Sequence, residues 1–153
     1  GDDAQDEHLY KFVTRETYRP GRTSGRCLDE GTLYAARFGD DGRGEWLPLD
    51  HSDAAFRAAA AASNLVFEDQ ADVLVNTRLA ADVVGATRMD RPGRATVDPA
   101  TGEVCVSLRR DPTPGAGAAD DVQRPLATPR GAVIRWRELA RRPEALRFDW
   151  DAT

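Results

Sequence analysis

The stretch Thr32–Leu49, TLYAARFGDDGRGEWLPL, is the part of the sequence that decides the fold class. Two runs rich in apolar residues, Thr32–Phe38 and Gly44–Leu49, flank the tetrapeptide Gly39-Asp40-Asp41-Gly42. Glycine reaches the positive φ angles of tight turns, and aspartate bonds its side chain to the turn backbone. Local chemistry alone therefore predicts a β-hairpin over this stretch.

Further short strands are predicted on both sides of this hairpin. An alternating pattern over His8–Thr14 indicates a strand before it. A second hairpin is expected where Arg94–Asp98 and Glu103–Arg109 flank the turn Pro99-Ala100-Thr101-Gly102. Short strands joined by tight turns are typical of β-sandwiches and propeller blades. The remaining extended segments are expected at Gly131–Trp136 and Phe148–Trp150.

Two helices are predicted between the two hairpins. Ser52–Asn64 is rich in alanine, with Ser52 as the expected N-cap. Glu68–Val84 has helical spacing and ends before Gly85. A long mobile loop is expected over Asp111–Pro129, which is rich in proline and glycine. The fold class is therefore mainly β with two helices. The apolar face of the second helix is expected to comprise Ala71, Leu74, Val75, Leu79 and Val83.

Composition narrows the class of protein. The 153 residues carry a formal net charge of -5, with 41% hydrophobic and 31% charged residues. These values are typical of a globular protein and argue against wholesale disorder or a coiled coil. No apolar run approaches the roughly 20 residues of a membrane-spanning helix. The acidic balance argues against a nucleic-acid partner, since proteins with that role usually carry a basic surface.

The segment Asn76–Pro92, NTRLAADVVGATRMDRP, holds the charged groups best suited to binding. Arg78 and Asp82 are four residues apart, which predicts an ordinary ion pair on a helix surface. Arg91 follows the helix in a loop, where its guanidinium could bind a phosphoryl group through two hydrogen bonds. The structural alternative is an Asp90–Arg91 pair that only fixes the loop.

Candidate metal ligands are sparse. Asp2, Asp3 and Glu7 form an acidic run before the first predicted strand, and calcium binds several carboxylate oxygens. Ordinary solvation of charges at a chain end explains the same run. The two histidines are far apart in sequence, without a second ligand at metal spacing. Cys27 and Cys105 fit no zinc pattern and are expected to be ordinary residues, with a bridge between them as the alternative.

Five stretches follow one another in an order that is specific to a known family. They are GDDAQDEHLYKFVTRE, LDEGTLYAARFGDDGRGEWLPL, DVLVNTRLAADVVGATRMDRP, VDPATGEVCVSL and PRGAVIRWRE. Together they resemble the C-terminal half of the PhoX-type alkaline phosphatases. The most distinctive part is the run through GATRMDRP, which ends in Met89-Asp90-Arg91-Pro92.

This resemblance implies a fold, a reaction and a location. The family's fold is a six-bladed β-propeller. Its members hydrolyse phosphomonoesters and are exported by the twin-arginine route, to the periplasm or outside the cell. The family site holds iron and calcium ions, bound by carboxylates and a cysteine. By position in the motif, Arg91 would contact the phosphate with support from Asp90, and the Asp2-Asp3 pair would face the metals.

Departures from the family pattern bear on activity. Gly93 stands where the family has a metal-binding glutamate, and glycine has no ligand atom. Arg109-Arg110 replaces an asparagine-rich strand end, and Ala132 replaces a histidine. The family's ligand cysteine lies in its N-terminal half, so Cys27 and Cys105 are not expected to replace it. Because metal catalysis requires a fixed ligand set, this chain alone is predicted not to hydrolyse phosphate esters at a useful rate.

The chain length also bounds the fold. Propeller blades have roughly 40–50 residues, so residues 1–153 are expected to form about three blades, the C-terminal fragment of a larger propeller. An incomplete ring exposes strand edges, which predicts pairing with an N-terminal half or self-association, besides the family's phosphomonoester substrate. Two alternatives to a diverged phosphatase stay open. One is a non-catalytic propeller-derived binding or structural module, and the other is a truncated product without independent function.

Overall fold

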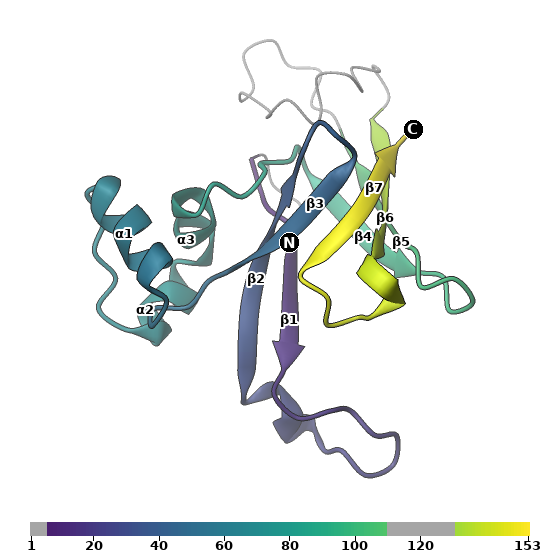
Figure 1. Ribbon diagram of the computed structural model, residues 1–153, viewed down its shortest axis with the longest axis horizontal. Helices are drawn as coiled ribbons and strands as arrows, with labels where there is room; N and C mark the ends of the chain where they lie inside the picture. The colour runs from purple at the N-terminus through teal and green to yellow at the C-terminus, as the bar shows by residue number, and fades with distance from the viewer. Residues whose placement is uncertain (1–5, 110–130) are drawn as a thin grey trace.

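A computed structural model describes residues 6–109 and 131–153 of the chain. In this part, seven strands form one curled sheet, and three α-helices lie beside it (Figure 1). The mainly-β prediction is confirmed, with one helix more than expected. The predicted loop Asp111–Pro129, Arg110 and the acidic pair Asp2-Asp3 lie outside the described residues.

The sheet is antiparallel throughout, with the strand order β1-β2-β3-β7-β6-β5-β4. Strand β7 pairs with β3 on one side and with β6 on the other. Because β7 is the last strand in the chain, the two halves of the sheet are joined only when this C-terminal segment is in place. The strands are β1 Tyr10–Thr14, β2 Gly31–Phe38, β3 Arg43–Pro48, β4 Pro92–Val97, β5 Val104–Leu108, β6 Ala132–Glu138 and β7 Arg147–Ala152.

The β2–β3 hairpin confirms the prediction from the glycine-aspartate turn. The Gly39 N–H donates to the Arg43 carbonyl (2.8 Å), and the Gly42 N–H donates to the Gly39 carbonyl (3.2 Å). Gly42 has a φ of 75°, a conformation that glycine adopts without steric cost. The Asp41 carboxylate accepts from the Arg43 N–H at 3.1 Å, which is the side-chain contact expected of aspartate in a turn.

Two separate cores lie on opposite faces of β2, because successive side chains of a strand point to opposite faces. Ala35 and Ala36 are adjacent, and both are fully buried. Ala36 belongs to the inner core, where the Phe38 ring lies 5.0 Å from the Phe148 ring. Ala35 belongs to the outer core between the sheet and the helices. The other buried members of the outer core are Leu49, Phe56, Ala60, Phe67, Val73, Ala80, Ala81 and Ala86.

The first helix, α1 Ala54–Ala62, begins one residue later than the sequence predicted. Its N-cap is Asp53, whose carboxylate accepts from the N–H groups of Ala55 (2.7 Å) and Phe56 (2.9 Å). The prediction of Ser52 as the cap is wrong, because the Ser52 N–H and hydroxyl both bond to the Asp50 carboxylate. Asp53 is therefore the residue that satisfies the first helical N–H groups.

The second predicted helix is two helices, α2 Gln70–Val75 and α3 Thr77–Val83. Asn76 separates them with φ -101° and ψ 38°, and its side-chain amide donates to the Asp72 carboxylate at 2.7 Å. This bend redirects the apolar face, so the predicted face is wrong at four positions, whereas Val83 packs against the outer core as expected. Val73, Ala80 and Ala81 are buried, whereas Leu74, Val75 and Leu79 are exposed. Among the described residues, no helix is long and apolar enough to cross a membrane.

Candidate functional site

The loop Thr87–Arg91 connects α3 to β4 and carries the residues that the sequence singled out. It lies against β2 just beyond the end of the β1–β2 pairing. The Thr87 N–H donates to the Ala36 carbonyl at 2.9 Å, and the Phe38 N–H donates to the Thr87 hydroxyl at 2.9 Å. Thr87 is therefore anchored to the sheet through both its backbone and its side chain.

A second anchor joins this loop to the segment before β1. Glu7 and Met89 form an isolated antiparallel bridge, with N···O distances of 3.0 and 2.7 Å. The Met89 side chain is fully buried in the inner core, and Glu7 is also buried. The fold thus brings residues about 80 positions apart in sequence into one backbone contact. This contact lies directly before Asp90 and Arg91, the two residues predicted to take part in phosphate binding.

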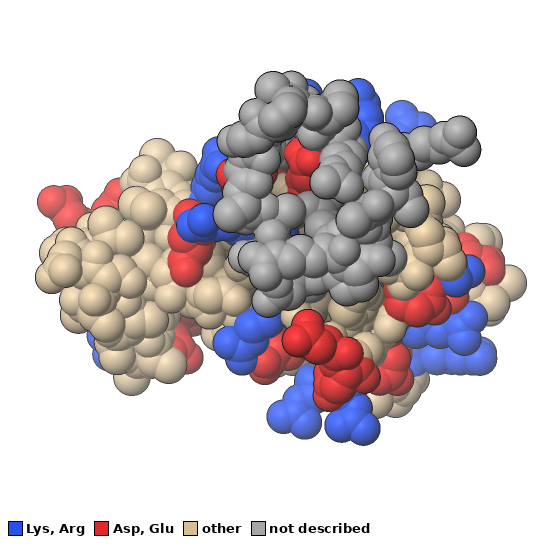
Figure 2. Space-filling model, turned by 90° about the horizontal axis from the view of Figure 1, so that it is seen from above, with Lys and Arg blue, Asp and Glu red and all other residues tan. Residues whose placement is uncertain are grey.

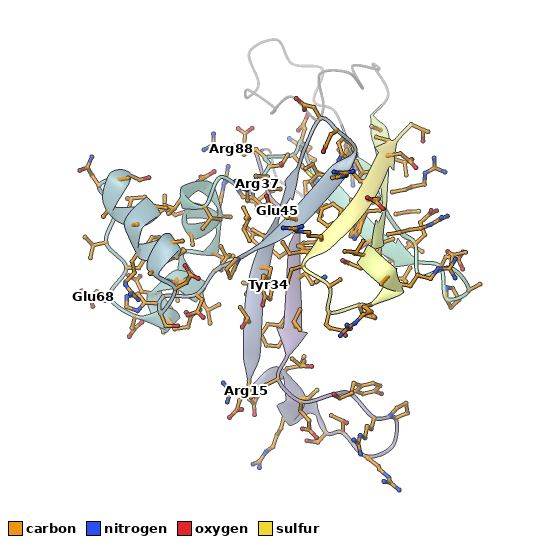
Figure 3. The ribbon with its side chains drawn as sticks, in the orientation of Figure 1. Arg15, Tyr34, Arg37, Glu45, Glu68 and Arg88 are labelled. Atoms are coloured by element: carbon orange, nitrogen blue, oxygen red, sulfur yellow. The ribbon has the colours of Figure 1, made fainter. Side chains whose placement is uncertain are left out.

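Charged side chains of both signs lie near these anchors, and Figure 2 shows acidic and basic side chains next to one another on the face seen from above. The predicted Arg78–Asp82 pair is wrong, because both partners are taken elsewhere. Arg78 lies 3.4 Å from the Glu7 carboxylate. Asp82 accepts from Arg88 Nε at 2.7 Å and lies 3.2 Å from His8 Nε2. Arg88 reaches from the loop toward α3 (Figure 3), so Asp82 ties the helix to the loop.

Asp90 and Arg91 follow the anchors directly. Asp90 is buried, and Arg91 is half-buried with a φ of 45°. This φ is rare for a residue with a side chain, and such conformations persist only where the surroundings fix them. The Arg91 carbonyl accepts from the Arg109 N–H at 3.3 Å, which adds a contact from the end of β5. The roles of Arg91 in phosphate contact and of Asp90 in support stay predictions.

Gly93 lies two residues further on, at a bulge in the β4–β5 pairing between Pro92 and Ala95. A Cβ atom at Gly93 would lie 2.7 Å from Ser107 Oγ and 3.2 Å from the Ser107 carbonyl oxygen. Such distances are too short for ordinary packing. The space that the family's glutamate stem would occupy is therefore taken by β5.

The described residues do not fit the iron and calcium ions that the family implies. Between residues 6–109 and 131–153, no group of three or more histidine, cysteine or carboxylate residues is arranged to hold a metal ion. Cys27 and Cys105 are both free thiols. The donor set therefore gives no basis for deriving a metal-dependent step from this part of the chain.

A half-buried polar cluster was missed by sequence reasoning. Lys11 Nζ lies 3.0 Å from the Glu138 carboxylate and donates to the Ala145 carbonyl at 2.6 Å. The Trp46 indole N–H donates to both Glu138 oxygens at 3.2 Å, and Lys11 lies 4.8 Å from the centre of the Trp46 ring. The only signals were that Lys11 is the sole lysine and that it lies among apolar strand residues.

Burial governs the titration of this cluster. It lowers the pKa of the Lys11 ammonium, and the hydrogen bond and charge of Glu138 oppose that shift. It raises the pKa of the Glu138 carboxyl, against the opposing effect of Lys11 and of the indole N–H groups. Burial also raises the pKa of the Tyr10 phenol, assisted by the charges of Glu7 and Asp82.

The Lys11–Glu138 cluster borders a cavity of about 550 Å³. Strands from both ends of the sheet order, β1 and β4, contribute to its walls, because the sheet curls around it. Its lining comprises Leu9, Tyr10, Lys11, Trp46, Gly93, Ala95, Val97, Gly102, Val104, Trp136, Glu138, Arg141 and Pro143. The cavity therefore lies on the concave side of the sheet, and Gly93, two residues after Arg91, forms part of its wall.

Comparison with known proteins identifies the family. The profile of alkaline phosphatase PhoX matches residues 1–153. The chain belongs to the PhoX alkaline phosphatase family. Among solved structures, it is similar to Pseudomonas fluorescens PhoX in complex with vanadate, a transition state analogue, with 35% identity and a TM-score of 0.77. No curated protein matches the chain.

The PhoX match covers 99% of this chain but only 27% of the PhoX chain. The resemblance read from the sequence is thereby confirmed, and so is a mainly-β, partial propeller-like fold. Membership of the PhoX family also supports a phosphatase-like relationship. What the whole PhoX protein does is not carried over to this chain by the match, because nearly three quarters of that protein has no counterpart here.

Proposed function

We propose that this chain forms the C-terminal part of a PhoX-type phosphomonoesterase, in which Arg91 contacts the phosphate of the substrate. PhoX family membership and similarity to a vanadate-bound PhoX support the phosphatase relationship. The observation that carries the proposal is the double anchoring of the loop at Thr87 and Met89, directly before Arg91. An arginine that orients a reacting phosphate must be held in one geometry, and these anchors supply it.

The chemistry proposed for Arg91 follows from its guanidinium. Its planar N–H groups bind two oxygens of a phosphoryl group in parallel and stabilise the negative charge that builds up during transfer. Asp90 precedes it in the same loop with a buried side chain, and we assign it a supporting role in holding the loop. Lysine at position 91 would keep the charge and lose the paired geometry.

The proposal separates a longer enzyme from this chain alone. In the family, iron and calcium would supply cationic charge and activate the attacking group, whereas Gly93 contributes no ligand atom here. We therefore propose that residues 1–153 alone do not hydrolyse phosphomonoesters at a useful rate. Export by the twin-arginine route, to the periplasm or outside the cell, belongs to the same proposal, and cell fractionation of the source organism tests it.

Turnover and binding assays test the two halves of the proposal separately. The purified chain should release no p-nitrophenol from p-nitrophenyl phosphate, with calcium and ferric iron added, above a metal-free blank. Orthovanadate binding, followed by ⁵¹V NMR, should weaken in Arg91→Lys and stay unchanged in Arg15→Lys, a surface arginine paired with Glu30. Turnover above the blank would overturn the inactivity, and equal vanadate affinity in both variants would overturn the role of Arg91. An in-frame coding sequence upstream of Gly1 tests whether the chain is part of a longer protein.

A second candidate function is a non-catalytic binding or structural module. Two observations favour it: the space at Gly93 is closed by Ser107, and β1 and β4 stand at the two ends of the sheet order. Strands at sheet ends can pair with another segment or with a second copy of the chain. Bound metal, measured by plasma emission after incubation with iron and calcium, favours the enzyme. Concentration-dependent sedimentation without bound metal favours the module, and the absence of cooperative unfolding favours a truncated product.

A further inference from the structure

His8 is fully buried and makes a contact through each of its ring nitrogens. Nδ1 lies 3.0 Å from the Thr87 carbonyl oxygen. Nε2 lies 3.2 Å from the Asp82 carboxylate. One imidazole ring therefore joins the segment before β1 to Thr87, the first residue of the Thr87–Arg91 loop, and to helix α3.

Both partners of this ring are hydrogen-bond acceptors. A backbone carbonyl can only accept a hydrogen bond, and so can an ionised carboxylate. Asp82 also accepts from Arg88 Nε at 2.7 Å. Both contacts of His8 are hydrogen bonds only when both ring nitrogens carry a proton, that is, in the imidazolium form. A neutral ring keeps one bond and turns a lone pair toward the other acceptor.

Charged and polar groups from every neighbouring element lie near the His8 ring. Helix α3 contributes Asp82 and, through its ion pair with Glu7, Arg78. The loop contributes Arg88, whose Nε donates to the same Asp82 oxygen, Oδ1, that His8 Nε2 contacts. Strand β1 contributes the Tyr10 ring, edge-on at 6.2 Å between ring centres. Asp82 is therefore the anion shared by His8 and Arg88.

The consequence for the loop follows from where His8 is attached. Thr87 is bound to Ala36 through its N–H and to Phe38 through its hydroxyl, so the His8 bond satisfies its carbonyl. Thr87 is four residues before Arg91, whose positive φ persists only while the loop is fixed. We infer that His8, through the contacts of both ring nitrogens, is a positioning residue that holds the Thr87–Arg91 loop. Its value for catalysis rests on the function proposed above, whereas its effect on the loop does not.

Hydrogen exchange of the loop, followed by NMR on the intact chain, tests the inference. Exchange of the Met89 amide in His8→Phe should be faster by roughly 10- to 100-fold, the range expected for loss of hydrogen bonds to a charged group. His8→Asn and His8→Gln should each rescue part of the protection, since the Asn amide can donate to Thr87 and the Gln amide to Asp82. Amides of β5 and β6 serve as the internal reference, because a global loss of stability would accelerate their exchange equally.

A variant of the other histidine shows whether the effect belongs to the His8 ring. His51→Gln is the matched control, because His51 bonds to Phe67 in the helical region and should not affect Met89. Met89 exchange that is unchanged in His8→Phe, or that is equally fast in His8→Phe, His8→Asn and His8→Gln, would overturn the inference.

The vanadate titration distinguishes failure of the inference from failure of the proposed function. If His8→Phe accelerates Met89 exchange and weakens orthovanadate binding, the inference and its role in the site are both supported. If Met89 exchange responds but neither the unmodified chain nor any variant binds vanadate, the loop inference stands and the proposed phosphate contact fails.

Discussion

Restoring a glutamate at position 93 is predicted to destabilise the fold before it can restore a metal ligand. The new Cβ would lie 2.7 Å from Ser107 Oγ and 3.2 Å from the Ser107 carbonyl oxygen. The hydroxyl can rotate away because Ser107 is exposed, but the carbonyl belongs to the backbone of β5. The strand must therefore move by a few tenths of an ångström, at the bulge where the β4–β5 register already shifts.

The expected magnitude combines two opposing effects. Overpacking of this kind costs about 1–3 kcal/mol. Gly93 does not have a positive φ, so replacing it also restricts the unfolded chain and stabilises the fold by about 0.4–1 kcal/mol. The net loss for Gly93→Glu or Gly93→Ala should be about 1–2 kcal/mol. For a chain of this size, that corresponds to a Tm lower by roughly 2–8 °C.

Thermal and urea unfolding of single and double variants measure this effect. Gly93→Ala isolates the Cβ atom from the charge, and Ser107→Gly in the same chain should recover part of the loss, with a coupling of at least about 0.5 kcal/mol. Gly25→Ala is the matched control, because a Cβ there meets nothing within 4 Å. If Gly93→Ala melts at the temperature of the unmodified chain, the packing argument is wrong, and the missing glutamate is independent of Ser107.

Three further predictions concern capping and the Lys11–Glu138 ion pair. Asp53→Ala should lower the free energy of unfolding by about 1 kcal/mol, since two helix N–H groups lose their acceptor, whereas Ser52→Ala should cost much less. Equal urea midpoints for these two variants would contradict the assignment of the cap. Lys11→Met should cost about 1–3 kcal/mol at pH 7, because the half-buried Glu138 carboxylate loses its cation but still accepts from the Trp46 indole. Urea unfolding measures this loss, and unchanged stability would show that the pair is unimportant. Burial raises the pKa of Glu138 above 4.5, so the native state binds this proton more tightly than the unfolded chain does. The contribution of Glu138 to stability therefore falls as pH rises from 4.5 through the native pKa, and Glu138→Gln should remove that part of the Tm–pH curve.

Local chemistry was sufficient where neighbouring residues decide the structure. The Gly39–Gly42 turn and its hairpin form as predicted, because glycine and aspartate satisfy the turn without help from elsewhere. Local chemistry failed where two adjacent residues compete for one role. Ser52 and Asp53 are both good caps, and only the position of Asp50 decides that Ser52 is used in a different hydrogen bond.

The helical pattern failed for a tertiary reason. Glu68–Val84 has one continuous helical spacing, yet the chain bends at Asn76 and buries Ala80 and Ala81 instead of Leu79. Ala80 and Ala81 of α3 belong to the same outer core as Ala35 of β2, which is also small and fully buried, and dense packing there selects residues by size. Periodicity counts apolar residues, but it does not record which of them fit the opposing surface.

The sequence by itself determined the mainly-β class, the hairpins, the PhoX resemblance and the residues of the Arg91 loop, because these depend on local turn chemistry and on a contiguous motif. Only the tertiary structure decided what surrounds those residues. It paired Glu7 with Met89, buried His8 between Thr87 and Asp82, and closed the space at Gly93 with Ser107. The physical reason is sequence separation. Each of these contacts joins residues that become neighbours only when the sheet curls and the helices pack against it. A local sequence pattern does not predict contacts between residues that are far apart in the chain.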